Sequence, residues 1–216
     1  MTKIENEKFN VIFLILEGKN RWKEIQETLK LQNPTLIKIL NELTEKGVIY
    51  TKIDEKDRRV SRYYINFTEL AKFFNEEFNI GLTQEEIEEF GKWMENNTQK
   101  LVDIWKFNDT LSEYTTPQII AFQLKSASEI TKLIRELEKK VKKPAIQWLK
   151  EANLKSPVLE EMIRRSDMKG LPEPILEKLS KIKTHPYLDG MIAVLHTVIK
   201  WRWLNDKDIC CGMGLE

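Results

Sequence analysis

The sequence predicts a mainly α-helical protein in which three N-terminal helices and a β-hairpin precede a longer, all-α region. Apolar residues recur at helical spacing through most of the chain, and one pair of β-branched segments occurs between residues 48 and 65. Glycine is scarce, with 8 in 216 residues, which favours helices. With 41% hydrophobic and 32% charged residues, the composition is typical of a globular protein with a heavily charged surface.

The first three predicted helices cover residues 4–17, 22–31 and 35–46. In each of them, apolar side chains recur at the spacings of one helix face. Gly18 and Gly47 follow the first and third helices, and glycine is common just beyond the end of a helix. The second and third helices are separated by a short turn, which is typical of a helix-turn-helix.

A β-hairpin is predicted directly after the third helix. Residues 48–53 alternate as a half-buried strand does, residues 54–57 form a polar turn, and residues 60–65 are β-branched and aromatic. A basic hairpin beside a helix can contact phosphates or the minor groove while the helix lies in the major groove. The cationic residues expected at the hairpin tip are Lys56, Arg58, Arg59 and Arg62.

The third helix begins with residues that suit both a helix start and contact with bases. Asn33 is the expected N-cap and Pro34 the expected first helical residue. Thr35, Lys38 and Asn41 follow at i, i+3 and i+6, away from the apolar face. Lysine donates to guanine edges and asparagine pairs with adenine, so we expect this line to face the groove, with Asn33 near its start.

The N-terminal part of the chain, about residues 4–75, resembles the winged helix-turn-helix transcriptional regulators of the MarR type, and more loosely the HxlR and ArsR groups. The MarR wing carries a D-x-R-D-x-R pattern, to which Asp54, Lys56, Asp57 and Arg59 correspond, with lysine in place of the first arginine. The glycine of the L-T-x-x-G pattern that follows the family's wing has no counterpart in this sequence.

The resemblance implies that the chain binds double-stranded DNA through this head. It assigns residues 34–46 to a recognition helix in the major groove, and residues 54–62 to a wing on the backbone or in the minor groove. The competing interpretation is that the basic residues are ordinary solvated charges. The family's additional N-terminal dimerisation helix has no counterpart, so its mode of dimerisation and its ligand pocket are not carried over. The residues expected on phosphates are Arg21, Lys23, Lys56, Arg58, Arg59 and Arg62.

The rest of the chain is predicted to be helical. Thr83 and Glu86 form a capping-box pattern at the start of a helix with a heptad-like seam. The seams of helices 83–107 and 117–142 form either an intrachain core or the contact with a second copy. The helices expected in this part cover residues 68–78, 83–107, 117–142, 145–152, 156–165, 172–182 and 187–204.

The predicted domains are a DNA-binding domain at residues 1–78, an all-α dimerisation or effector domain at residues 79–209, and a flexible tail at residues 210–216. The net charge is only +1, but the charge is unevenly distributed. Residues 18–62 carry 11 Lys/Arg against 7 Asp/Glu, whereas residues 76–114 carry 3 against 10. This asymmetry indicates distinct faces with distinct partners.

Residues that carry enzyme chemistry are scarce. The sequence contains two histidines and lacks a P-loop, a G-x-G-x-x-G, an H-E-x-x-H and a paired C-x-x-C pattern. We therefore expect no enzyme activity, cofactor or metal, and the spacing of His196, Cys210 and Cys211 matches no zinc pattern. The adjacent cysteines, together with the lack of a leader-like N-terminus and of a long apolar run, favour a cytoplasmic protein without a membrane segment.

These observations predict a cytoplasmic, sequence-specific, DNA-binding transcriptional regulator that forms a homodimer through its C-terminal helices. The sequence does not identify a small-molecule effector for this regulator. The composition, rich in lysine, isoleucine and glutamate, is compatible with an archaeal source. The alternatives are a replication or partition factor of a plasmid or virus, and a winged-helix module that binds other proteins.

Overall fold

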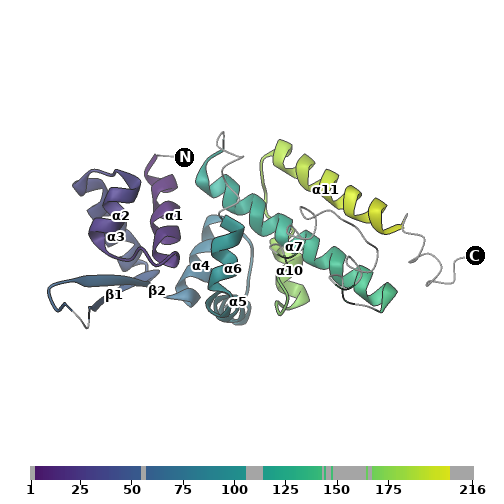
Figure 1. The fold of residues 1–216 in the computed structure, drawn as a ribbon, viewed down its shortest axis with the longest axis horizontal. Helices are drawn as coiled ribbons and strands as arrows, with labels where there is room; N and C mark the ends of the chain where they lie inside the picture. The colour runs from purple at the N-terminus through teal and green to yellow at the C-terminus, as the bar shows by residue number, and fades with distance from the viewer. Residues whose placement is uncertain are drawn as a thin grey trace, which may run out of the picture. The chain divides into compact units, whose positions relative to one another are not determined.

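The computed structural model describes residues 3–54, 57–105, 114–142 and 167–204, together with Pro144, Gln147 and Arg164 (Figure 1). The described chain is mainly helical, with a two-stranded antiparallel sheet after three N-terminal helices, as predicted. It divides into two compact units, Met1–Ile120 and Ala121–Glu216. The predictions for Lys56, for the helices at 145–152 and 156–165, and for the tail at 210–216 lie outside the described residues, apart from the single positions named above.

The first unit begins with α1 (Lys3–Leu16), α2 (Trp22–Leu29) and α3 (Asn33–Glu45). The three predicted helices are therefore confirmed, and their ends differ from expectation by at most two residues. Their apolar faces meet in one core, because these faces lie at the 3.6-residue period of a helix. The core side chains of these helices are Phe9, Val11, Ile12, Leu14, Ile15, Ile25, Leu36, Ile39, Leu40 and Leu43.

The start of α3 differs from the prediction. Gln32 is the N-cap, in an extended conformation, while Asn33 and Pro34 are the first two helical residues. Proline is tolerated at both positions because the first backbone N–H groups of a helix have no partner within it. The Asn33 side chain instead accepts a hydrogen bond from Gln26 Nε2 of α2, which links the two helices across the turn.

The hairpin consists of β1 (Ile49–Ile53) and β2 (Ser61–Ile65), with Tyr50 opposite Tyr64 and Lys52 opposite Arg62. The expectation that β1 is half-buried by alternation is wrong. Ile49 is buried, but the four residues after it are exposed. After Ile49 the side chains of β1 are exposed, and burial returns at Asp54, directly past the strand. The hairpin runs beside α2 and α3 (Figure 1).

Three further helices of the first unit are α4 (Phe67–Glu77), α5 (Gln84–Asn96) and α6 (Thr98–Trp105). Phe74 of α4 stacks on Phe9 of α1, with ring centroids 6.2 Å apart. The first compact unit extends to Ile120, past residue 78, where the sequence predicted a domain boundary. How function divides between the parts of the chain stays a prediction.

The predicted helix at residues 83–107 is interrupted at Asn97, which has φ −125° and separates α5 from α6. Asn97 Nδ2 donates 2.8 Å to the carbonyl of Trp93, one turn back, and so satisfies a carbonyl at the end of α5. The capping box at Thr83 and Glu86 is confirmed. The seam residues Ile87, Phe90, Met94 and Leu101 are buried inside the chain, which supports the intrachain interpretation of this seam.

The second unit contains most of α7 (Thr116–Val141), with α10 (Glu173–Leu179) and α11 (Pro186–Leu204). The predicted stripe of α7 is buried at Ile130, Leu133, Ile134 and Leu137. Two buried hydroxyls attach the segment around α10 to α7. Thr131 Oγ1 accepts a bond of 2.8 Å from the backbone N–H of Met168, and Ser128 Oγ donates to the Leu176 carbonyl. In the described ranges, no helix has the length and apolar character needed to cross a membrane.

Candidate nucleic-acid interface

Helix α3 has a buried face and an outward face. The buried face consists of Leu36, Ile39, Leu40 and Leu43. Of the residues predicted to contact bases, Asn33, Lys38 and Asn41 are exposed, while Thr35 is half-buried. The exposed residues of α3 are Asn33, Pro34, Ile37, Lys38, Asn41, Thr44 and Glu45.

Ile37 is a candidate contact that the sequence analysis missed. Its side chain is 49% exposed, although isoleucine is usually buried, and it lies on the same face as Lys38 and Asn41. An apolar side chain on such a face can contact the methyl group of thymine. The sequence signal that could have identified Ile37 is its position in the helix. It lies one residue after Leu36 and three after Pro34, outside the apolar stripe.

Glu42 does not reduce the positive charge of this face. It forms an ion pair with Lys8 of α1, and both side chains are partly buried. The Glu42 carboxylate is therefore directed toward α1, where Lys8 compensates its charge. Glu45 is exposed, but it is the last residue of α3, away from Lys38.

A buried carboxylate shared by two arginines lies just past the last strand pair, Ile53–Ser61, directly below the turn of the hairpin. The Asp54 side chain is only 5% exposed, and its Oδ2 accepts from Arg62 Nε at 2.6 Å and from Arg21 Nη2 at 3.0 Å. Arg62 Nη1 also donates to Asn20 Oδ1 at 3.0 Å. Charge-assisted bonds of this kind are among the strong hydrogen bonds in proteins. We call Asn20, Arg21, Asp54 and Arg62 the hairpin root.

Backbone contacts join the same loop to the hairpin. Tyr63 N–H donates 2.8 Å to the carbonyl of Asn20, and Arg21 forms an isolated antiparallel bridge with Arg62. The loop before α2 thus adds a short third row beside β2. Because side-chain and backbone bonds act together, the root fixes the hairpin relative to α2 and α3.

This geometry changes the expected role of Arg62. The sequence analysis assigned it to the cationic tip, but it lies on β2 opposite Lys52, below the tip. Its Nε is already bound to Asp54, as is one nitrogen of Arg21. Both guanidinium groups are partly exposed, so they keep donors for a phosphate. In the structure, however, they bind Asp54 and thereby hold the hairpin.

The hairpin tip presents Arg58 and Arg59, which are both exposed. Asp57 organises the turn: its Oδ1 accepts 3.1 Å from the Arg59 N–H, and its carbonyl accepts 2.9 Å from the Val60 N–H. The strands close below it through the Asp54 N–H and the Val60 carbonyl at 2.8 Å. The two guanidinium groups therefore stand on a short, hydrogen-bonded turn.

Lys23, the remaining predicted phosphate contact, lies on the exposed side of α2. Its Nζ is 3.8 Å from Glu27 one turn later. An exposed pair of this kind is worth little in water, so Lys23 can exchange this partner for a phosphate.

The outer face of the hairpin carries an aromatic pair that sequence reasoning did not single out. The rings of Tyr50 and Tyr64 stack with centroids 5.8 Å apart, and Lys52 Nζ lies 5.3 and 5.4 Å from them. Tyr63 is on the opposite face, where burial raises the pKa of its phenol. Cross-strand pairing explains this arrangement, because Tyr50 and Tyr64 are direct partners in the register.

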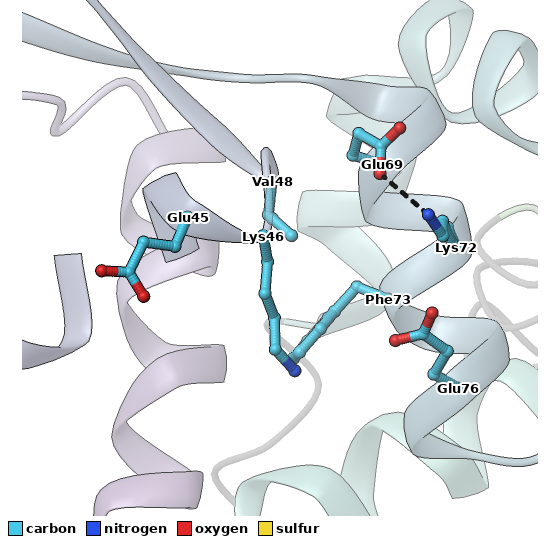
Figure 2. A pocket seen from close by; sticks show the side chains of 7 residues that line it. All are labelled: Glu45, Lys46, Val48, Glu69, Lys72, Phe73 and Glu76. Atoms are coloured by element: carbon cyan, nitrogen blue, oxygen red, sulfur yellow. Dashed lines mark ion pairs between the residues drawn. The ribbon is translucent and has the colours of Figure 1, made fainter. Parts of the chain in front are cut away.

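A shallow pocket of about 230 Å³ lies between the end of α3 and α4 (Figure 2). Figure 2 shows Lys46 extending toward Phe73, whose ring centroid is 5.0 Å from Nζ, and Lys72 paired with Glu69 at 3.8 Å. Three glutamates outnumber two lysines in the lining, which does not suit a phosphate. The lining residues are Glu45, Lys46, Val48, Glu69, Lys72, Phe73 and Glu76.

Comparison with family models, with curated proteins and with solved structures finds no match for this chain.

Proposed function

We propose that this chain is a sequence-specific, double-stranded DNA-binding transcriptional regulator whose N-terminal unit contains a winged helix-turn-helix. The proposal takes α2 and α3 as the helix-turn-helix and the hairpin as the wing. It also takes the short third row beside β2 as a support for the wing.

The observation that carries the proposal is that exposed cations without an ion pair lie both on α3 and at the hairpin tip. Within the described residues, Lys38 on α3 and Arg58 and Arg59 at the hairpin tip form no ion pair. Arg21 and Arg62, by contrast, are held by Asp54. Cations left exposed on a helix face and at a nearby hairpin tip suit a ligand that offers phosphates on both sides of a groove.

In the proposed complex, α3 lies in the major groove. Lys38 and Asn41 supply donors for guanine and adenine edges, and Ile37 supplies an apolar contact for a thymine methyl. Arg58 and Arg59 contact the backbone or the adjacent minor groove. The hairpin root keeps the tip and α3 in the relative orientation that both contacts require.

The proposal is tested with the full chain by selecting bound duplexes from a random pool and measuring affinity by fluorescence anisotropy at several salt concentrations. We expect the selected sequence to bind about a thousandfold or more tighter than a scrambled duplex. The variant Arg58→Ala/Arg59→Ala should lower the salt slope by about 2, since each phosphate contact contributes about 0.9, and should weaken all sequences alike. Lys38→Ala should instead lose about 1–3 kcal/mol of discrimination at one base position.

Lys181→Ala is the matched control, because Lys181 is an exposed lysine of the second unit. It should leave the affinity, the salt slope and the sequence preference unchanged. Binding without sequence preference would contradict sequence-specific regulation. If neither variant of the N-terminal unit differs from the control, the chain does not bind DNA through this surface, and a protein-binding module becomes the better description.

A further inference from the structure

Helix α11 is apolar on two opposite sides. Its inner side buries Leu188, Ile192 and Ile199. Its outer side exposes Tyr187 and Val194 at 65% each. A helix that is apolar all round is normally covered all round, but no described residue of this chain covers the outer side of α11.

The outer side also lacks charge. Over residues 186–197, which are all described, none of the exposed side chains is charged. Asp189 is half-buried, and its carboxylate is paired with Lys125 of α7 at 2.7 Å. The exposed residues are Pro186, Tyr187, Gly190, Met191, Ala193, Val194 and Thr197. We call Tyr187, Gly190, Met191 and Val194 the outer face of α11.

Gly190 is an independent sign that a second surface approaches here. It lies inside the helix and its φ is not among the positive values, so the backbone does not require glycine. A Cβ built on it would meet nothing within 4 Å, so packing against the described part of the chain does not require glycine either. Glycine inside a helix is less stable than alanine, but it leaves room for another backbone to approach closely at this position.

The same chain uses this device internally at Gly91 of α5. A Cβ there would lie 2.9 Å from Thr68 Cα and 3.0 Å from the Phe67 carbonyl oxygen. The missing side chain is what lets α5 pack tightly on α4. Gly190 offers the same kind of opening, but toward solvent.

We propose that the outer face of α11 is the interface of a homodimer, in which α11 packs against α11 of a second copy across a twofold axis. In a twofold contact, residues near the axis meet their own copies, so a charged face repels itself and an uncharged face does not. The sequence analysis favoured helices 83–107 and 117–142 for dimerisation, but the apolar seam residues that the structure describes in them are buried within the chain. The interface does not depend on DNA binding, although it would bring two α3 helices together on paired half-sites.

The test is the mass of the full chain in solution, measured by sedimentation equilibrium from about 1 to 100 µM. We expect a dimer for the unmodified chain. Val194→Glu should raise the dissociation constant at least about tenfold, because it places a charge beside its own copy. Ile53→Glu is the matched control, since Ile53 on the hairpin is equally exposed, at 67%, and this variant should leave the dimer intact.

Gly190→Ala tests the interface without introducing a charge, because we expect it to maintain or raise the stability of the fold while it weakens the dimer. Alanine is the better helix residue and its Cβ meets no described atom of its own chain, so the variant should fold at least as well as the unmodified protein. In the dimer, its methyl group occupies the space of the partner helix, and the dissociation constant should rise about tenfold. A chain that is monomeric at about 100 µM, or a dimer unaffected by both variants, overturns the proposal.

The proposed dimer interface and the proposed DNA-binding function can be contradicted independently of each other. If the chain is dimeric but binds no duplex, the interface stands and the proposed function falls. If the chain is monomeric and binds a single half-site, the function stands and this interface falls.

Discussion

Arg62 and Asp54 face each other across the root of the hairpin, with Arg62 Nε 2.6 Å from Asp54 Oδ2. Asp54 directly follows β1 and Arg62 lies in β2, so the pair closes the hairpin below its tip. Arg21, which precedes α2, donates to the same oxygen at 3.0 Å. One carboxylate therefore connects both strands of the hairpin to the start of the helix pair.

The first prediction concerns Asp54→Asn, which keeps the side-chain shape and removes the charge. Two guanidinium groups lose their shared partner, and we expect the free energy of unfolding to fall by about 1–3 kcal/mol in urea. Affinity for the selected duplex should also fall, although the substitution makes the chain more positive by one charge. A loss of affinity against the direction of the charge change is the mark of a hairpin that has lost its orientation.

Asp57→Asn is the control for this prediction, because it makes the same charge change at the exposed tip. Asparagine keeps an acceptor for the Arg59 N–H, so stability should change by less than about 0.5 kcal/mol. Affinity should stay the same or rise. Equal behaviour of the two variants would mean that the root does not position the hairpin.

The second prediction concerns Ile37→Ala on the outward face of α3. Because Ile37 is 49% exposed, stability should change by less than about 0.5 kcal/mol. Affinity for the selected duplex should fall about fivefold, on the order of 1 kcal/mol for lost apolar burial. Replacing thymines of the duplex one at a time by uracil, which lacks the methyl group, should reproduce this loss at one position.

Uracil at that position should not change the affinity of the Ile37→Ala variant, because this variant already lacks the contact with the methyl group. Ile53→Ala is the control, since Ile53 is an exposed isoleucine of the hairpin. It should keep the uracil effect. If uracil weakens the unmodified chain and the Ile37→Ala variant equally at every position, Ile37 contacts no thymine methyl.

Local patterns in the sequence predicted the helices well, because each depends on neighbours a few residues away. The apolar periodicity gave α1, α2 and α3, and the capping box located the start of α5. The alternation of residues 48–53 wrongly predicted a half-buried strand. Alternation indicates which face of the strand a side chain occupies, but not whether another element covers that face. Beyond Ile49, nothing in the sequence of β1 itself indicates that its side chains are exposed.

The hairpin root could not be predicted from sequence for a different reason. Arg21 and Asp54 are 33 positions apart, and their contact depends on how the loop before α2 meets β2. The basic pattern of the wing indicated cations but could not separate Arg62, which is bound at the root, from Arg58 and Arg59 at the tip. The heptad-like seam of residues 83–107 was likewise compatible with an internal core or a partner, and only the packing of α5 on α4 distinguishes the two.

The third prediction concerns Gly91→Ala in α5. Alanine usually stabilises a helix, but here its Cβ would lie 2.9 Å from Thr68 Cα and must displace backbone. We expect a loss of about 1–3 kcal/mol in the free energy of unfolding, as for other overpacked sites. Glu89→Ala, on the exposed side of the same helix, should stay within about 0.5 kcal/mol. A Gly91→Ala protein as stable as the unmodified chain would show that α5 can move away from α4 at little cost.

The last prediction concerns the pH dependence of the contact between α7 and α11. Burial raises the pKa of Asp189, but hydrogen bonds from Lys125 and Thr184 and the charge of Lys125 outweigh burial, so the pKa lies below its ordinary value of 3.8. A carboxyl whose pKa is lowered by folding stabilises the folded state above its unfolded pKa. This contribution is lost as the pH falls through the folded pKa.

Asp189→Asn should therefore lower the urea midpoint at about pH 7, where the Asp189 carboxylate is charged, and lower it less as the pH falls below the ordinary value of 3.8. Glu136→Gln, at an exposed position of α7, is the matched control and should leave the midpoint at about pH 7 unchanged. The measurement is the difference in midpoint between Asp189→Asn and the unmodified chain along a pH series. A difference that stays constant into acid would contradict the prediction, because the stability lost would then come from packing at the start of α11 and not from the charge of Asp189.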